Sequence, residues 1–211
     1  MSSILNNSRK RIAVFASGNG SNLQAIIDYP KNIDINGDLV FVFSNNPDAF
    51  ALERARKAGI NAECIPFDKN GPRIEFDNKI LKAVKNKNID LICLAGYMLL
   101  LSPDFIKEYK NKIINIHPSL LPSFKGMHGI RDAFDYGVKT TGVTVHFVDR
   151  ELDNGPIILQ EAVVVNEGET VIDLEKKIHK LEHRLYPQAV RHFCRDELRI
   201  IGRKVLIVER N

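Results

Sequence analysis

The sequence predicts an α/β domain built on a single doubly wound, mostly parallel sheet. Short apolar runs rich in β-branched residues alternate with amphipathic helical segments, which is the pattern of crossover units. The length of 211 residues suits one domain. No repeat, low-complexity tract or linker divides the chain. We therefore expect one domain over residues 11–211, after a polar N-terminal tail of residues 1–10.

The first half of the chain reads as four strands separated by three helices. Residues 11–16 form an apolar run that ends in glycines, as a buried strand does. The helix over 21–29 carries its apolar side chains at helical spacing, and residues 21–24 fit a capping box at its start. A later helix closes at Gly59. The other elements expected here are strands over 38–43, 61–65 and 89–94 and helices over 48–58 and 73–86.

The second half begins with a strand over 112–116, which Pro118 ends because proline cannot donate to a sheet. Two further strands are expected over 144–148 and 157–165, and the sequence leaves open whether they run antiparallel. The chain then forms a long C-terminal helix from residue 171 to about 193 and a hairpin over 198–208 that turns near Gly202.

The composition fits a globular enzyme that handles small molecules. The formal charge is +4 with scattered basic residues, which falls short of the basic footprint of a nucleic-acid-binding protein. No apolar run approaches the roughly 20 residues of a membrane helix, and the N-terminus lacks a signal-peptide pattern. Cys64, Cys93 and Cys194 show neither a disulfide nor a metal spacing. We expect a cytoplasmic protein without metal, nucleic-acid or membrane partners, as a monomer or homodimer.

A glycine-rich loop, residues 17–22, joins the first strand to the first helix. It is not a dinucleotide fingerprint, because Leu23 takes the third glycine position and no acidic residue ends the second strand. It is not a P-loop, because Gly-Lys-Ser/Thr is absent. The N–H groups at a helix start can hold a single phosphate. A capped turn that binds nothing is the alternative, and the sequence leaves both open.

Asn115 and His117 are the most informative pair. They lie two residues apart, so in a strand they share a face, and they stand at its carboxyl end, where open α/β sheets bind ligands. An Asn amide can stabilise an oxyanion, and a His can move a proton near neutral pH. The pair suits attack of an amine on a carbonyl-type carbon. Satisfaction of local backbone groups is the simpler alternative.

A third loop, residues 149–156, is rich in acids and turn formers. A carboxylate near His117 would orient the ring and favour its charged form. Asp149, Glu151 and Asp153 are all candidates, and the residues alone do not choose among them.

Three stretches are similar to the phosphoribosylglycinamide formyltransferase family, which uses 10-formyltetrahydrofolate in purine synthesis. They are Gly-Asn-Gly-Ser-Asn-Leu (18–23), Asn-Ile-His-Pro-Ser-Leu-Leu-Pro (115–122) and Asp-Arg-Glu-Leu-Asp-Asn-Gly-Pro (149–156), in the same order and context. The likeness runs from about residue 11 to 193. The resemblance implies a Rossmann-like formyltransferase fold for the domain over 11–211.

The resemblance also implies roles for individual residues. It assigns catalysis to Asn115, His117 and Asp153, which chooses Asp153 among the three acids. It assigns contacts with the phosphate and ribose of the substrate to Gly20, Ser21, Asn22, Leu23, Gln24, His179 and Glu182. It assigns contacts with the folate to Arg73, Met98, Leu99, Leu100, Leu101, Asn115, Asp149, Arg150, Glu151, Leu152 and Asp153.

The function that the resemblance implies is transfer of the formyl group from 10-formyltetrahydrofolate, the co-substrate, to the amine of 5-phosphoribosylglycinamide. The amine attacks the formyl carbon directly and passes through a tetrahedral intermediate. The alternatives are a formyltetrahydrofolate deformylase, which is a hydrolase, a formyltransferase for another amine, including methionyl-tRNA, and a nonenzymatic nucleotide-binding module.

Overall fold

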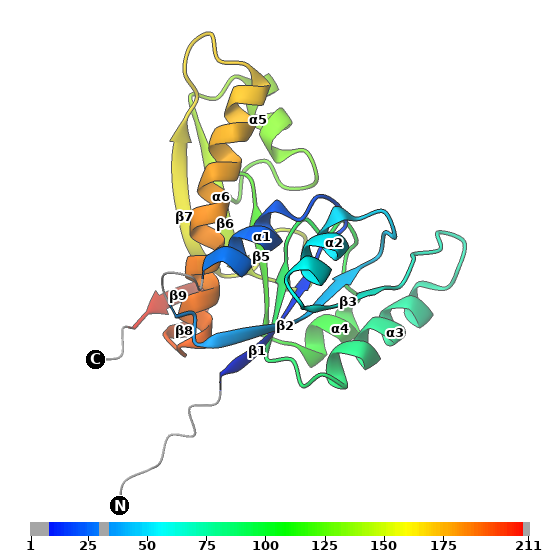
Figure 1. Cartoon of the computed structure of the whole chain (residues 1–211). Coiled ribbons are helices and arrows are strands. Elements are labelled where there is room, and N and C mark those ends of the chain that lie inside the picture. Colours follow the sequence, from blue (N-terminus) through cyan, green and yellow to red (C-terminus); the bar gives the residue numbers. More distant parts are fainter. Residues whose placement is uncertain (1–8, 30–33, 209–211) are drawn as a thin grey trace, which may run out of the picture.

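The computed structural model describes residues 9–29 and 34–208, which form one mixed sheet with helices on both faces (Figure 1). Within these ranges the sheet has nine strands in the order β3-β2-β1-β4-β5-β6-β7-β9-β8. In chain order the elements are β1 (Lys10–Phe15), α1 (Ser21–Asp28), β2 (Gly37–Ser44), α2 (Phe50–Lys57), β3 (Asn61–Cys64), α3 (Arg73–Lys85), β4 (Leu91–Leu94), α4 (Pro103–Glu108), β5 (Ile113–His117), α5 (Gly129–Tyr136), β6 (Thr140–Phe147), β7 (Ile157–Val164), α6 (Val171–Cys194), β8 (Leu198–Ile201) and β9 (Lys204–Ile207).

The sheet confirms the predicted doubly wound fold with a C-terminal helix and hairpin. The five neighbouring strands β3, β2, β1, β4 and β5 are parallel to one another. The strand order reverses between β1 and β4. Strand β6 runs antiparallel to both β5 and β7, which resolves the alternative that the sequence left open, and β7 pairs with β9 in parallel. The carboxyl ends of β1, β4 and β5 therefore meet beside the point where the strand order reverses, which is where such sheets bind ligands.

Each face of the sheet has its own apolar core. Helices α1, α2 and α6 cover one face, and α3 and α4 cover the other (Figure 1). Tyr186 of α6 is fully buried, and its hydroxyl lies 2.8 Å from the carbonyl oxygen of Leu94 and 3.1 Å from that of Ile114. These contacts attach α6 to the ends of β4 and β5, next to Asn115, so the helix helps to set the position of the strand that carries the predicted chemistry.

Three local features differ from the sequence prediction. The short helix α4 was not predicted, because its six residues are too few to show a stripe; the Ser102 hydroxyl caps it by accepting from the N–H of Phe105. Helix α5 was likewise missed. The capping box predicted over residues 21–24 is wrong, since α1 has Gly20 as its N-cap residue. The side-chain capping box lies instead at α6, between Thr170 and Asp173.

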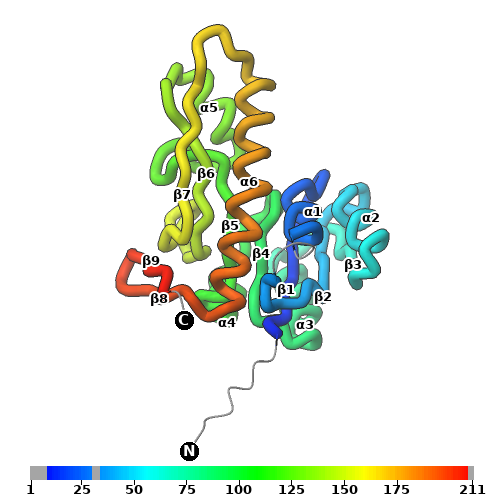
Figure 2. The backbone as a smooth tube through the Cα atoms, turned by 60° about the vertical axis from the view of Figure 1, so that its left-hand side comes forward, coloured from blue at the N-terminus to red at the C-terminus, as the bar shows by residue number. Residues whose placement is uncertain are grey.

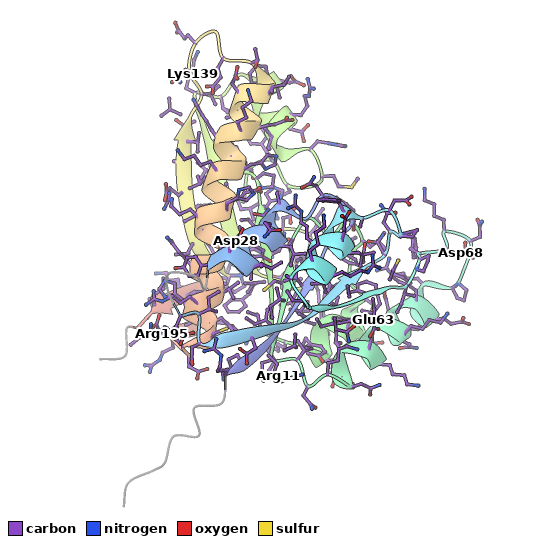
Figure 3. The ribbon with its side chains drawn as sticks, in the orientation of Figure 1. Arg11, Asp28, Glu63, Asp68, Lys139 and Arg195 are labelled. Atoms are coloured by element: carbon purple, nitrogen blue, oxygen red, sulfur yellow. The ribbon has the colours of Figure 1, made fainter. Side chains whose placement is uncertain are left out.

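The charged side chains lie around the whole surface, as the scattered positions in the sequence predict; Figure 3 shows Lys139 and Arg195 near opposite ends of α6. None of the helices in the described residues is long and apolar enough to cross a membrane. Most of the predicted polar tail, residues 1–8, lies outside the described residues. The sheet begins at Lys10, one residue before the predicted start of the domain.

Candidate active site

Asn115 and His117 occupy the carboxyl end of β5, as the spacing predicts. The adjacent residues Ile114 and Ile116 are buried, so the polar pair projects from the opposite side of the strand. Asn115 lies opposite His146 of the antiparallel strand β6, and its Nδ2 is 3.3 Å from Nε2 of that ring. The antiparallel pairing thus adds a second histidine to the site. The sequence analysis did not include His146, because its only link to Asn115 is this long-range register.

The carboxylate of Asp153 is the centre of the cluster. Its Oδ1 lies 3.5 Å from Nδ2 of Asn115 and 3.8 Å from Nε2 of His146. Its Oδ2 lies 3.4 Å from Nδ1 of His117 and accepts a hydrogen bond of 2.8 Å from the backbone N–H of Gly126. Among Asp149, Glu151 and Asp153, it is Asp153 that lies beside His117.

The loop after β6 has a conformation that few sequences allow. Asp153 has a left-handed backbone with φ of 47°, which Asp tolerates better than most residues. A Cβ atom on Gly155 would lie 1.8 Å from the carbonyl oxygen of Phe147, so only glycine fits there. The hydrogen bond from the Phe147 N–H to Pro156 O closes this turn. The close approach of the two chain segments directs Asp153 back over β5.

Burial of the His146 ring favours its neutral form. Burial lowers the pKa of His146, against the opposing effects of the hydrogen bond to Phe147 and of the Asp153 charge. Its Nδ1 donates to the carbonyl of Phe147 at 2.8 Å, so Nε2 carries the lone pair and accepts from Asn115. This contact orients the Asn115 amide with its N–H groups toward Asp153 and away from the strand.

The His117 ring faces an oxygen acceptor at each nitrogen. Its Nε2 lies 2.8 Å from the carbonyl oxygen of Phe124, and its Nδ1 faces Asp153. Both ring nitrogens therefore face groups that accept hydrogen bonds. Phe124 and Gly126 thus contact the cluster through their backbone, a role that no side-chain pattern in the sequence could indicate.

A cleft of about 510 Å³ leads from this cluster toward α3 and α4. Of the eleven residues predicted to contact folate, ten line it; Met98 does not, and its N–H donates instead to Ser17 Oγ at 2.9 Å. His117 does not line the cleft either, but its ring contacts Asp153, which does. The lining residues that the sequence analysis did not name are Asp77, Leu94, Tyr97, Ser102, Pro103, Ile106, His146 and Val148.

Arg73 closes the far end of the cleft. Its Nε donates to Asp77 at 2.9 Å, its Nη2 donates to the carbonyl of Leu100, and its guanidinium lies over the rings of Phe67 and Phe76. The Arg73 side chain is about one third exposed, so it can bind an anionic group at this far end of the cleft. The cleft therefore has a cation at one end and the Asn115 amide at the other.

A second polar region lies at the start of α1. Gly20 is the N-cap residue with φ of 74°, and among the residues that the structure describes no side chain caps the helix. The first N–H groups of α1 therefore stay available for a phosphate. Arg54 of α2 holds the loop from behind, with Nε donating to Asn19 O at 2.8 Å and Nη2 donating to Asn19 Oδ1 at 3.0 Å.

Glu182 and His179 of α6 stand beside this helix start. Glu182 is 5% exposed, and its Oε2 accepts from Asn22 Nδ2 at 3.2 Å and from His179 Nδ1 at 2.9 Å. Leu23 is fully buried in the core, so only its backbone can meet a ligand. Within the described residues no group of three or more His, Cys, Asp or Glu side chains is arranged to hold a metal ion.

Replacing Gly20 with alanine is expected to destabilise the protein by about 1–3 kcal/mol. The new Cβ would lie 2.7 Å from the Cβ of Ala51, and the left-handed backbone would be strained. Thermal unfolding measures the effect. Gly18→Ala is the matched control, because its Cβ would meet nothing within 4 Å. Equal melting temperatures for the two variants would contradict the close packing of α2 on this loop.

The chain is similar to known proteins over most of its length. Residues 10–190 match the family model described as formyl transferase. Phosphoribosylglycinamide formyltransferase of Escherichia coli is 42% identical over 90% of this chain and 89% of its own length. Trifunctional purine biosynthetic proteins adenosine-3 of several animals are 42–44% identical over 85–89% of this chain, which spans only 14–18% of their length.

Solved structures give the same grouping. Glycinamide ribonucleotide transformylase 1 from Symbiobacterium toebii superposes with a TM-score of 0.93 at 44% identity, covering 99% of both chains. A formyltetrahydrofolate deformylase from Pseudomonas syringae is more distant, with a TM-score of 0.88 at 27% identity over 95% of this chain and 66% of that chain. The match along the chain, together with the shared fold, shows that this protein belongs to the formyl transferase family.

Proposed function

We propose that the protein transfers the formyl group of 10-formyltetrahydrofolate to the amine of 5-phosphoribosylglycinamide in purine synthesis. The observation that carries the proposal is the Asp153 carboxylate, which lies within 3.5 Å of both Asn115 Nδ2 and His117 Nδ1. This cluster stands at the inner end of a cleft sized for a folate-like ligand. The uncapped start of α1 supplies a separate place for the phosphate of the acceptor.

The co-substrate fits the chemistry of the cleft. Its walls are largely apolar, with Leu99, Leu101 and Val148 among the lining residues, which suits a flat heteroaromatic ring. Arg73 at the far end suits a carboxylate tail. In this orientation the formyl-bearing nitrogen reaches the end of the cleft that Asn115 and Asp153 form.

The reaction follows from the polar groups at that end. The substrate amine attacks the formyl carbon, and the formyl oxygen becomes an oxyanion. The Asn115 N–H that faces Asp153 stabilises it by exchanging that carboxylate for the oxyanion. His117 in its protonated form provides a second donor once its Nε2 exchanges the Phe124 carbonyl for the oxyanion. Asp153 accepts the proton that the amine loses and, through water, passes it to the folate nitrogen as the carbon–nitrogen bond breaks. The products are the formylated amine and tetrahydrofolate.

An absorbance assay tests this function and its alternatives. Purified protein is incubated with 10-formyltetrahydrofolate, or its dideaza analogue, with and without glycinamide ribonucleotide. We expect cofactor turnover only when the ribonucleotide is present. Equal turnover without it would indicate a deformylase, in which water is the acceptor. No turnover by folded protein in either mixture would contradict the proposal and favour another amine or a binding role.

The affinity for the ribonucleotide is expected to depend on pH through His179. The hydrogen bond to Glu182 raises the pKa of His179, against burial, and the charge of Glu175 acts in the same direction. Burial lowers the pKa of the stacked His183, and the charges of His179 and Arg54 act in the same direction, which favours the uncharged form of His183. Above the raised pKa the His179–Glu182 pair carries a net negative charge, which repels a phosphate.

The KM for the ribonucleotide should therefore rise, within about tenfold, as the pH increases through the raised pKa of His179. The measurement is KM against pH for the wild type and for His179→Gln. Their ratio at each pH removes the effect of the ionisation of the phosphate itself. Parallel curves for the two proteins would show that His179 does not act on the phosphate.

A further inference from the structure

We infer that the C-terminal hairpin positions the catalytic carboxylate and that Arg203, at the hairpin turn, is the positioning residue. The inference rests on the proposed function of Asp153. Nη2 of Arg203 donates a hydrogen bond of 2.6 Å to the carbonyl oxygen of Asn154, the residue after Asp153. The family model ends at residue 190, before β8 and β9, so the hairpin is an addition to the part of the chain that it matches.

Each polar group of Asn154 other than its backbone N–H has a hydrogen-bond partner. Its Nδ2 donates to Asp149 Oδ2 at 3.2 Å, and its Oδ1 accepts from Lys125 Nζ at 3.4 Å. Its carbonyl accepts from Arg203. The contact with Asp149 lies within the same loop, the contact with Lys125 comes from the loop after β5, and the third comes from the hairpin.

The position of Asn154 matters because Asp153 has a left-handed backbone. Few residues adopt φ near 47° without outside support. A shift of the backbone at Asp153 and Asn154 would move the carboxylate away from His117 and from the N–H of Gly126. The Arg203 hydrogen bond opposes that shift, since it holds the carbonyl of Asn154, in the peptide between Asn154 and Gly155.

The hairpin can serve as a support because it is anchored at its base. Glu197, which is 4% exposed, accepts from His192 Nδ1 at 2.6 Å and pairs with Arg195 at 3.0 Å, joining the hairpin to the end of α6. The N–H of Val208 returns to Glu197 O at 2.8 Å.

The hairpin also joins the sheet. Lys204 of β9 pairs with Ile157 of β7, and Ile157 is only four residues after Asp153. Figure 2 shows the hairpin beside the ends of β6 and β7, where the loop of Asp153 lies. The turn is therefore held from α6 and from the sheet, and Arg203 extends from it to the loop.

The test compares Arg203→Ala with Arg199→Ala. Arg199 pairs through its backbone in the same hairpin, and its side chain forms no hydrogen bond or ion pair within the described residues. We expect Arg203→Ala to lower kcat by about three- to tenfold, which corresponds to the net contribution of one ordinary hydrogen bond, with KM for both substrates nearly unchanged. Arg203→Lys should recover part of the loss, and Arg199→Ala should match the wild type.

A second readout does not depend on activity. The N–H of Gly126 donates to Asp153 Oδ2, so its hydrogen-exchange rate reports the position of the carboxylate. Exchange at Gly126 should become several-fold faster in Arg203→Ala, while the N–H of Ile114 in the core stays unchanged. Unaltered exchange at Gly126, or a kcat equal to that of Arg199→Ala, would overturn the inference. An inactive wild type with faster Gly126 exchange in the variant would contradict only the proposed function.

Discussion

Replacing Asn115 with alanine is expected to lower kcat for formyl transfer by about 10²–10³-fold, the usual result of removing one oxyanion donor. The Asn115 amide is the donor nearest the inner end of the cleft, and neutral His146 holds it in place at 3.3 Å. Alanine removes the donor without a new contact, so the fold should persist. Steady-state kinetics with the ribonucleotide and the formyl folate measure the change.

Circular dichroism and thermal unfolding serve as the folding check for this variant. Asn166→Ala provides a matched control, because this asparagine lies exposed in the loop before α6. It should retain the activity of the wild type. An Asn115→Ala protein with full kcat would exclude the amide as an oxyanion donor. The same reasoning predicts a large loss for His117→Ala.

Replacing Asp153 with asparagine is expected to lower kcat by at least about 10²-fold; the comparable change in a Ser-His-Asp triad costs about 10⁴-fold. The Asp153 carboxylate faces three donors, namely Asn115 Nδ2, His117 Nδ1 and the Gly126 N–H. An amide has only one acceptor oxygen, so its NH₂ group must face at least one of these donors. The variant also lacks the negative charge that favours protonated His117 and accepts the proton of the amine.

Asp135→Asn is the control for this prediction. Asp135 lies exposed on α5 and does not line the cleft. The kcat of Asp135→Asn should match that of the wild type. A loss as large as that of Asp153→Asn would mean that the removal of any negative charge, and not the loss of the Asp153 contact with His117, lowers the rate.

The sequence determined the parts of this protein that depend on local pattern. Apolar runs and helical stripes predicted the strands and most helices, because a buried strand or an amphipathic helix must show its period in the residues themselves. The two-residue spacing of Asn115 and His117 predicted that they share a face at a strand end, where the structure has them. Those inferences need no knowledge of distant contacts.

The tertiary structure decided what depends on contacts between distant segments. The antiparallel register of β5 and β6 brings His146 opposite Asn115, and no local pattern encodes that pairing. The sequence of the acidic loop could not choose among its three carboxylates. The close packing of Gly155 against Phe147 directs Asp153 toward His117. The sequence predicted a capping box at the start of α1. In the structure Gly20 packs against Ala51 as the N-cap residue, and the first N–H groups of α1 remain available. Register, loop direction and cap choice are set by which segments pack together, and that packing is a property of the whole chain.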